Sequence, residues 1–333
     1  MHRRTLLAAG LAAALPAPGP AGAQPRPETL LVMEKTDHRL AFLDPSDGRR
    51  MAELDLPEFP HEFVVDAAGR HAFIGHYGVE SSASPGEGGH SVIVVDLAAR
   101  RILRGIDLSP FNRLHGMAID AADRLCVLSE EKAVLLSLDH PAEDGAAGYA
   151  VPTGGIKTHM LALSRDGERA YVTGLLSNTA SLVRPRDAAA APVVVTTGRM
   201  PEGCCLSPEE RTLYVGNRRS GTLVAVDTGT MRVRDTRAVG GDPLRVYPVR
   251  DGRLLLADLQ RESLSILRGD MSEIAHVPLG ARPSAASLHP TRPIAYVSLA
   301  SDEVAVVDLE RARVEGRIRT GRGADVTRLL PAG

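Results

Sequence analysis

Five residues that can bind a metal ion or transfer a proton open short apolar segments that recur along the chain. They are His61, His115, His159, Glu202 and Asp325. Imidazole and carboxylate groups bind divalent transition metals, and three histidines with an open position are typical of catalytic zinc. Without a metal, the same groups act as acids and bases near neutral pH. We therefore predict all five as catalytic residues and His61, His115 and His159 as ligands of a divalent transition metal.

The segments that carry these residues belong to an internal repeat. Together with segments that open at Leu244 and Ser284, they start 40 to 54 residues apart. Each is a short apolar run followed by a turn rich in Asp, Gly and Pro. A second strand, a third strand and a more charged fourth strand follow, as in residues 295–319. Four strands in roughly 40 residues are typical of one β-propeller blade.

The two ends of the chain determine the number of blades. Residues 30–56 read as second, third and fourth strands without a first, and residues 325–330 read as an isolated first strand. Joining them closes the ring and removes exposed sheet edges. The sequence thus predicts an all-β fold, a seven-bladed β-propeller. Its blades have four antiparallel strands, and the N- and C-terminal strands close the last blade.

First strands line the centre of a propeller, so the five predicted residues should meet at one mouth of the channel. Asp325 and Glu202 would flank the three histidines, because the seventh blade neighbours the first. A simpler interpretation is a wet channel in which the histidines bind only water or carbonyl groups. The ends of the second strands return to the same face and should bring in a second layer of polar residues. The aligned positions are His76, Ser129, Gly174, Asn217, Asp258 and Glu34, and the adjacent positions include Lys35, Tyr77, Glu130 and Arg218.

The repeat resembles the Tyr-Val-Thr-Asn β-propeller family. The likeness rests on Ser-Pro-Asp-Gly-like turns and Ala/Leu-Tyr-Val-Thr/Gly strands, clearest in residues 158–174 and 201–217, and it covers nearly all of the mature chain. The family includes lactonase-like enzymes and heavy-chain-like subunits of periplasmic amine dehydrogenases. Lactonase-like members imply a channel site of His, Glu and Arg, which His159, Glu202 and Arg245 would match. Arg245 stands one place after the ring position, so we expect its side chain to point away from the axis.

Composition and motifs exclude several classes of function. A net charge of −2 provides no basic field for nucleic acid. Tryptophan is absent, unlike in Trp-Asp repeat or quinone-cofactor propellers. The chain also lacks a Cys-x-x-Cys-His haem motif and a Gly-x-Ser-x-Gly nucleophile elbow.

The first 23 residues read as a secretory signal. Arg3 and Arg4 precede an apolar stretch, and residues 21–23 offer a small-residue cleavage site. The arginine pair resembles a twin-arginine signal, with general secretion as the alternative. We predict a signal peptide over residues 1–23 and a single propeller domain over residues 24–333. The mature chain should be periplasmic or secreted and should have no transmembrane segment.

Three functions fit this sequence. The first is a hydrolase or lyase that acts on a lactone or sugar-derived substrate at the channel mouth. The second is a non-catalytic propeller that binds a small-molecule ligand or a protein partner at its rim. The third is a subunit of a periplasmic redox complex, which needs a cofactor-bearing partner.

Overall fold

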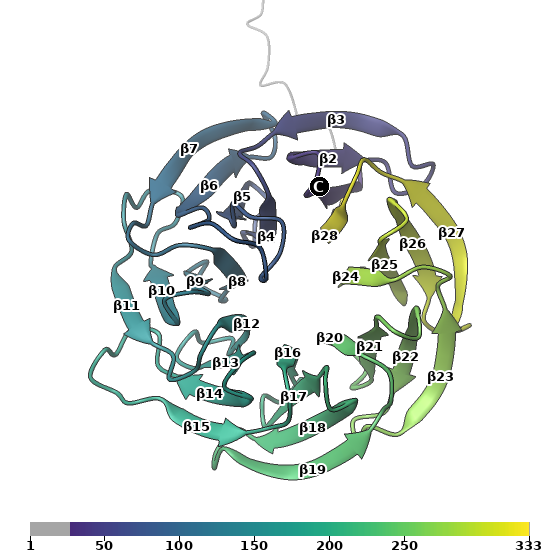
Figure 1. Cartoon of the computed structure of the whole chain (residues 1–333). Helices are drawn as coiled ribbons and strands as arrows, with labels where there is room; N and C mark the ends of the chain where they lie inside the picture. Colours follow the sequence, from purple (N-terminus) through teal and green to yellow (C-terminus); the bar gives the residue numbers. More distant parts are fainter. Residues whose placement is uncertain (1–26, 333) are drawn as a thin grey trace, which may run out of the picture.

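The computed structural model describes residues 27–332, and the predicted signal peptide lies outside them. Within this range, 28 strands form seven four-stranded sheets around a central axis (Figure 1). The prediction of an all-β, seven-bladed propeller is confirmed. The same range contains no helix with the length and apolar character needed to cross a membrane.

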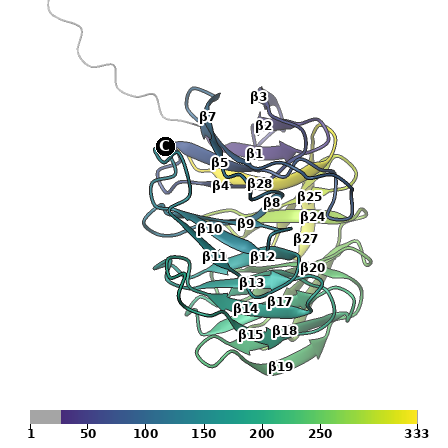
Figure 2. The same ribbon diagram turned by 60° about the vertical axis from the view of Figure 1, so that its left-hand side comes forward.

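Each blade runs from an inner strand at the axis to an outer strand at the rim, and Figure 2 shows the blades from the side. The inner strands are β4 (Pro60–Val65), β8 (Leu114–Ile119), β12 (Thr158–Leu163), β16 (Pro201–Leu206), β20 (Pro243–Pro248), β24 (Pro283–Leu288) and β28 (Ala324–Leu330). The second strands are β5 (His71–His76), β9 (Leu125–Ser129), β13 (Ala170–Gly174), β17 (Thr212–Asn217), β21 (Leu254–Asp258), β25 (Ile294–Leu299) and β1 (Thr29–Glu34).

The third and fourth strands complete the blades. The third strands are β6 (Ser91–Asp96), β10 (Val134–Leu138), β14 (Thr179–Val183), β18 (Thr222–Asp227), β22 (Ser263–Leu267), β26 (Glu303–Asp308) and β2 (Arg39–Leu43). The outer strands are β7 (Arg101–Asp107), β11 (Tyr149–Pro152), β15 (Val193–Thr196), β19 (Arg232–Ala238), β23 (Glu273–Pro278), β27 (Arg313–Arg319) and β3 (Arg50–Asp55).

The last blade joins the two ends of the chain, as the sequence predicts. Its strand order is β28-β1-β2-β3, and β28 pairs antiparallel with β1, with Leu30 opposite Leu329. This pairing fixes the register of the ring, because a slip by one residue would turn Leu329 out of the core.

Apolar side chains fill the spaces between neighbouring blades. One such cluster contains Leu31 and Phe42 from the last blade and Phe63 and Ile74 from the first. The second and third strands of the blades have buried positions on both faces, because each sheet packs against two neighbours, and this explains their Val-, Leu- and Ile-rich runs.

The inner strands are irregular near their starts. In the first blade, the pairing register of β4 with β5 shifts between Pro60 and Phe63, and the other six blades show a similar shift. A bulge of this kind removes residues from the ladder and breaks the strict alternation of side chains. Two consecutive residues near the start of an inner strand can therefore both face the axis.

Candidate functional site

The predicted ring residues all occupy the second position of an inner strand and are buried. They are His61, His115, His159, Glu202 and Asp325. The structure brings the three histidines side by side. The rings of His61 and His115 meet edge to face with centroids 4.4 Å apart, and those of His115 and His159 stack with centroids 3.7 Å apart.

A glycine allows the close approach of the second and third blades. A Cβ atom on Gly116, the residue after His115, would lie 2.6 Å from the carbonyl oxygen of His159. A side chain at this position would push β12 away from β8. Gly116 therefore keeps the two imidazoles within contact distance.

Carboxylates flank the row of histidines at both ends. Asp325 from the seventh blade pairs with Nδ1 of His61. At the other end, Nδ1 of His159 lies 2.9 Å from Oε2 of Glu130, and Nε2 lies 3.5 Å from Oε1 of Glu202. The His159 ring thus has a carboxylate at each nitrogen, an arrangement that favours the protonated imidazolium.

In the first and fifth blades, the residue after the predicted site position also faces the axis; these residues are Glu62 and Arg245. Arg245 is buried and donates from Nη2 to Oε1 of Glu62 at 2.6 Å. The expectation that Arg245 points away from the axis was wrong, because the bulge in β20 breaks the alternation on which it rested. Glu62 was not predicted as a site residue for the same reason, because β4 carries a similar bulge.

Three residues of the second layer, Tyr77, Glu130 and Arg218, lie against the predicted site residues, as expected. The hydroxyl of Tyr77 donates to Oε2 of Glu130 at 2.9 Å. Arg218 donates to Glu202 at 2.7 Å. Lys35, which follows β1, lies with Nζ 5.1 Å from the centroid of the Tyr77 ring.

The insertion between β5 and β6 is tied to this layer. Arg113 donates to the carbonyl oxygens of Ser84 and Gly86, both at 2.7 Å. Lys157 donates to the carbonyl oxygen of Ser82 and lies 3.7 Å from Oε1 of Glu130. The loop over residues 79–90 is therefore held beside the acidic group that contacts His159.

The electrostatics of the three central groups differ sharply. Burial would lower the pKa of His159, but hydrogen bonds to Glu130 and Glu202 outweigh it and raise the pKa to about 8. Burial, reinforced by the charges of His159 and His61, lowers the pKa of His115 well below its usual value. Burial would raise the pKa of Glu202, but contact with His159 lowers it to about 2. At neutral pH these effects favour a charged His159, a neutral His115 and an ionised Glu202.

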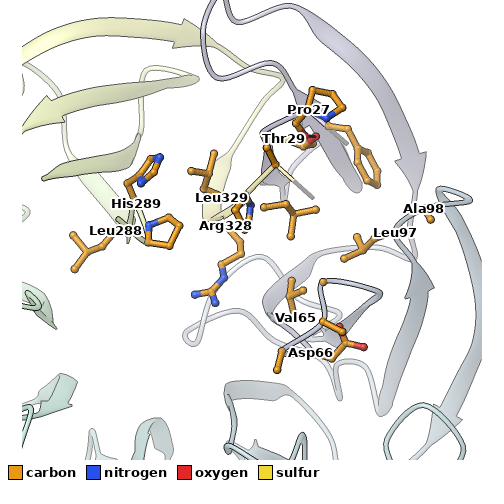
Figure 3. Close-up of a pocket in the computed structure, with 18 of the residues that line it drawn as sticks. Pro27, Thr29, Val65, Asp66, Leu97, Ala98, Leu288, His289, Arg328 and Leu329 are labelled. Atoms are coloured by element: carbon orange, nitrogen blue, oxygen red, sulfur yellow. Dashed lines mark hydrogen bonds between the residues drawn. The ribbon is translucent and has the colours of Figure 1, made fainter. Parts of the chain in front are cut away.

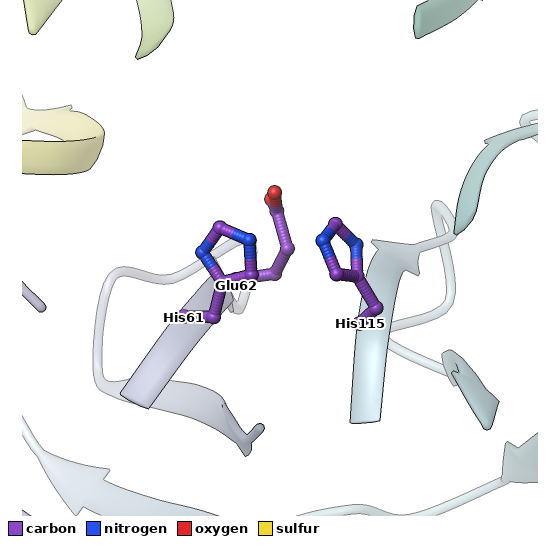
Figure 4. A group of neighbouring side chains, drawn as sticks. All are labelled: His61, Glu62 and His115. Carbon is purple, nitrogen blue, oxygen red and sulfur yellow. The ribbon is translucent and has the colours of Figure 1, made fainter. Parts of the chain in front are cut away.

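Donor atoms suited to a metal ion gather in two groups that share His115. The first group is His61, Glu62 and His115. The second group is His115, Glu130 and His159. Within each group the donor atoms lie within 4.8 Å of one another. Figure 4 shows the His61 and His115 rings as neighbours, with the Glu62 side chain extending past them. Both nitrogens of His159 lie beside carboxylates, whereas in the first group Nδ1 of His61 pairs with Asp325 and Oε1 of Glu62 accepts from Arg245. The prediction of a metal at His61, His115 and His159 stays a prediction.

Buried polar atoms of the site without a hydrogen-bond or ion-pair partner within residues 27–332 include Nδ1 of His115 and Nε of Arg245. A buried polar group without a partner is costly, and native proteins usually satisfy such groups. Both atoms therefore point to a ligand or solvent molecule at the axis.

Comparison with known proteins identifies the fold. No protein-family profile and no curated protein matches the sequence, so membership of the Tyr-Val-Thr-Asn family remains a prediction. A periplasmic gluconolactonase from Pseudomonas aeruginosa has a similar structure, with 15% identity and a TM-score of 0.74 over 92% of this chain and 99% of that chain. A functionally unknown protein from Desulfotomaculum acetoxidans DSM 771 shares 11% identity, with a TM-score of 0.71 over 89% of this chain and 98% of that chain.

A third similar structure is longer than this chain. It is the dihydro-heme d1 dehydrogenase NirN in complex with DHE, with 14% identity and a TM-score of 0.64. The match covers 89% of this chain but only 64% of NirN, which is less than two thirds of its length. At these identities, the three likenesses establish a shared propeller fold.

Proposed function

We propose that this protein is an exported hydrolase that opens a small sugar-derived lactone at the axial site, defined as the cluster around His61, His115 and His159. The observation that carries the proposal is the stacked pair of His115 and His159, whose rings lie 3.7 Å apart. Their surroundings drive the two pKa values in opposite directions. Two neighbouring groups with separated pKa values are suited to act as base and acid in one reaction.

Lactone hydrolysis uses both members of this pair. Neutral His115 accepts a proton from a water molecule, whose oxygen adds to the lactone carbonyl carbon. The bond between that carbon and the ring oxygen then breaks, and the ring oxygen takes the proton on Nε2 of charged His159, which lies 3.5 Å from Glu202 while Nδ1 stays hydrogen-bonded to Glu130. Transfer of the proton gained by His115 back to His159 restores the pair. One water molecule is consumed, and the product is a hydroxy acid. A positioned acid or base of this kind contributes typically 10²–10⁴-fold to a rate.

Arg245 is suited to stabilise the negative charge that develops on the carbonyl oxygen. Its Nη2 is held by Glu62, while its buried Nε has no acceptor among residues 27–332. A preorganised donor stabilises such a charge without the reorganisation that water would need. Glu62 therefore serves as a positioning residue for Arg245.

The choice of substrate and compartment rests on supporting observations. The gluconolactonase from P. aeruginosa shares the fold and acts in the periplasm. The predicted signal over residues 1–23 supports export of this chain. Aldonolactones are accordingly the first substrates to test.

The test is hydrolysis of γ- and δ-aldonolactones, including gluconolactone, followed as acid release above the spontaneous rate. The purified mature protein should hydrolyse at least one of them, and His115→Gln should lower the rate by about 100-fold or more. His276→Gln is the matched control, because His276 is exposed on outer strand β23. Absence of turnover with every lactone would overturn the proposal. Tight lactone binding without turnover would indicate a binding propeller instead.

A metal centre at His61, Glu62 and His115 is the second candidate, favoured by the unpartnered Nδ1 of His115. A divalent ion held there would supply a Lewis acid or an activated water. Elemental analysis of protein purified without chelating resin tests it. About one equivalent of a transition metal, lost in His115→Ala, would support the metal centre over the metal-free acid–base pair. No metal in either protein would exclude it.

A further inference from the structure

A cavity lies at the face of the propeller opposite to the axial site, where the inner strands end. Its volume is about 690 Å³, which lies within the range of small-molecule sites. Segments that follow β4, β20, β24 and β28 contribute to it, so it spans the axis and the space between the last and first blades. Figure 3 shows Arg328 extending between Leu288 on one side and Val65 on the other.

The charged side chains that line this cavity are mostly cationic. They are Arg100, Arg250, Arg328 and a single acid, Asp66. The two Asp66 oxygens are already engaged, one by the backbone N–H of Arg70 at 2.6 Å and the other by Nδ1 of His71 at 2.9 Å. The cavity therefore has a surplus of positive charge, although the whole chain carries a net charge of −2.

Arg328 stands out among these cations. Neither its guanidinium nor that of Arg250 has a hydrogen-bond or ion-pair partner in the range 27–332, whereas Arg100 lies over the ring of Phe42 at 5.5 Å. Of the two, Arg328 extends between the apolar walls at Leu288 and Val65 (Figure 3). A planar guanidinium offers two parallel donors that match a carboxylate. Arg328 lines the cavity and is exposed to solvent, so its guanidinium is free to pair with an anion that enters from outside.

The remaining lining is largely apolar. Val65, Leu97, Leu288, Leu329 and Pro248 contribute to the walls. Inorganic anions would leave these walls exposed to water, whereas a ligand with a hydrocarbon body would cover them.

We propose that this cavity is a second binding site that takes a small organic carboxylate with an apolar body, its carboxylate paired with Arg328. Arg328 and the apolar walls lie outside the axial site, so this proposal holds whether or not the protein hydrolyses lactones.

The proposal is tested by calorimetric titration of the mature protein with octanoate, octanol and sulfate as separate probes. Octanoate should bind, octanol and sulfate should bind at least tenfold more weakly, and Arg328→Met should weaken octanoate binding by tenfold or more. Arg232→Met is the matched control, because Arg232 is exposed on outer strand β19. The melting temperature of Arg328→Met should match that of the wild type, since the side chain has no partner to lose.

Other outcomes would overturn the proposal. Equal binding of octanol and octanoate would show that no cation recognises the ligand. Sulfate binding as tight as octanoate would mean that the apolar walls contribute nothing. Octanoate binding that Arg328→Met leaves unchanged would place the ligand elsewhere.

Discussion

Arg245 and Glu62 form a buried ion pair of 2.6 Å across the propeller axis, although 183 residues separate them in the sequence. Arg245 belongs to the fifth blade and Glu62 to the first, so the pair links blades that are not neighbours. Removing one partner of a buried pair leaves an uncompensated charge, which typically costs about 3–5 kcal/mol.

We therefore expect Arg245→Met to lower the free energy of unfolding by an amount in this range, and Glu62→Gln to act similarly. The double variant should be more stable than the sum of the single effects predicts, because neither charge remains alone. Urea denaturation of the four proteins in this cycle measures the coupling. Additive effects would mean that the two side chains do not interact in solution.

Gly116→Ala should separate the stacked histidines. The added methyl group would lie 2.6 Å from the backbone oxygen of His159, so β12 must shift. Overpacking of this kind typically costs about 1–3 kcal/mol, and lactone hydrolysis should fall with it. Gly105→Ala is the matched control, because a Cβ there meets nothing within 4 Å. Equal stability and activity of the two variants, measured by urea denaturation and acid release, would contradict the packing argument.

The protonation of His159 should make stability depend on pH. Its pKa is about 8 in the folded protein against an ordinary 6.5. A raised pKa contributes stability that is fully present below about pH 6.5 and is lost as the pH rises through about 8. The wild type should therefore lose more thermal stability than His159→Gln between pH 6 and pH 9. Parallel melting curves for the two proteins would show that His159 is not charged in the fold.

Arg113→Met should release the loop over residues 79–90. The variant loses both 2.7 Å hydrogen bonds to the carbonyl oxygens of Ser84 and Gly86. Limited proteolysis should then cut the loop faster than in the wild type, because cleavage follows local opening. Arg165→Met, at an exposed turn, should leave the cleavage rate unchanged. If both variants are cut at the wild-type rate, Arg113 does not restrain the loop.

The sequence was sufficient to predict the architecture and the positions of the ring. The repeat aligns the inner strands without gaps, so a residue that opens one segment lies level with those that open the others. The alignment alone therefore predicts that His61, His115 and His159 lie together. The split last blade followed from the same alignment, because residues 325–330 supply the strand that the N-terminus lacks.

The electrostatic roles within the ring could not be predicted in this way. A bulge leaves no mark in the residue types of an inner strand, so Glu62 and Arg245 were missed or misplaced. The charge on His159 depends on Glu130 and Glu202, which come from two other blades. Their spacing in the sequence says nothing of the distances that set a pKa.

The pH dependence of kcat/KM for lactone hydrolysis tests the central claim most directly, because it reports the acid and the base of the free enzyme. The wild type should lose activity as the pH rises through about 8, where His159 gives up its proton. His159→Gln should be slower by about 10²–10⁴-fold and should lack this alkaline limb. A variant with the wild-type rate and profile would contradict the assignment of His115 and His159 as base and acid.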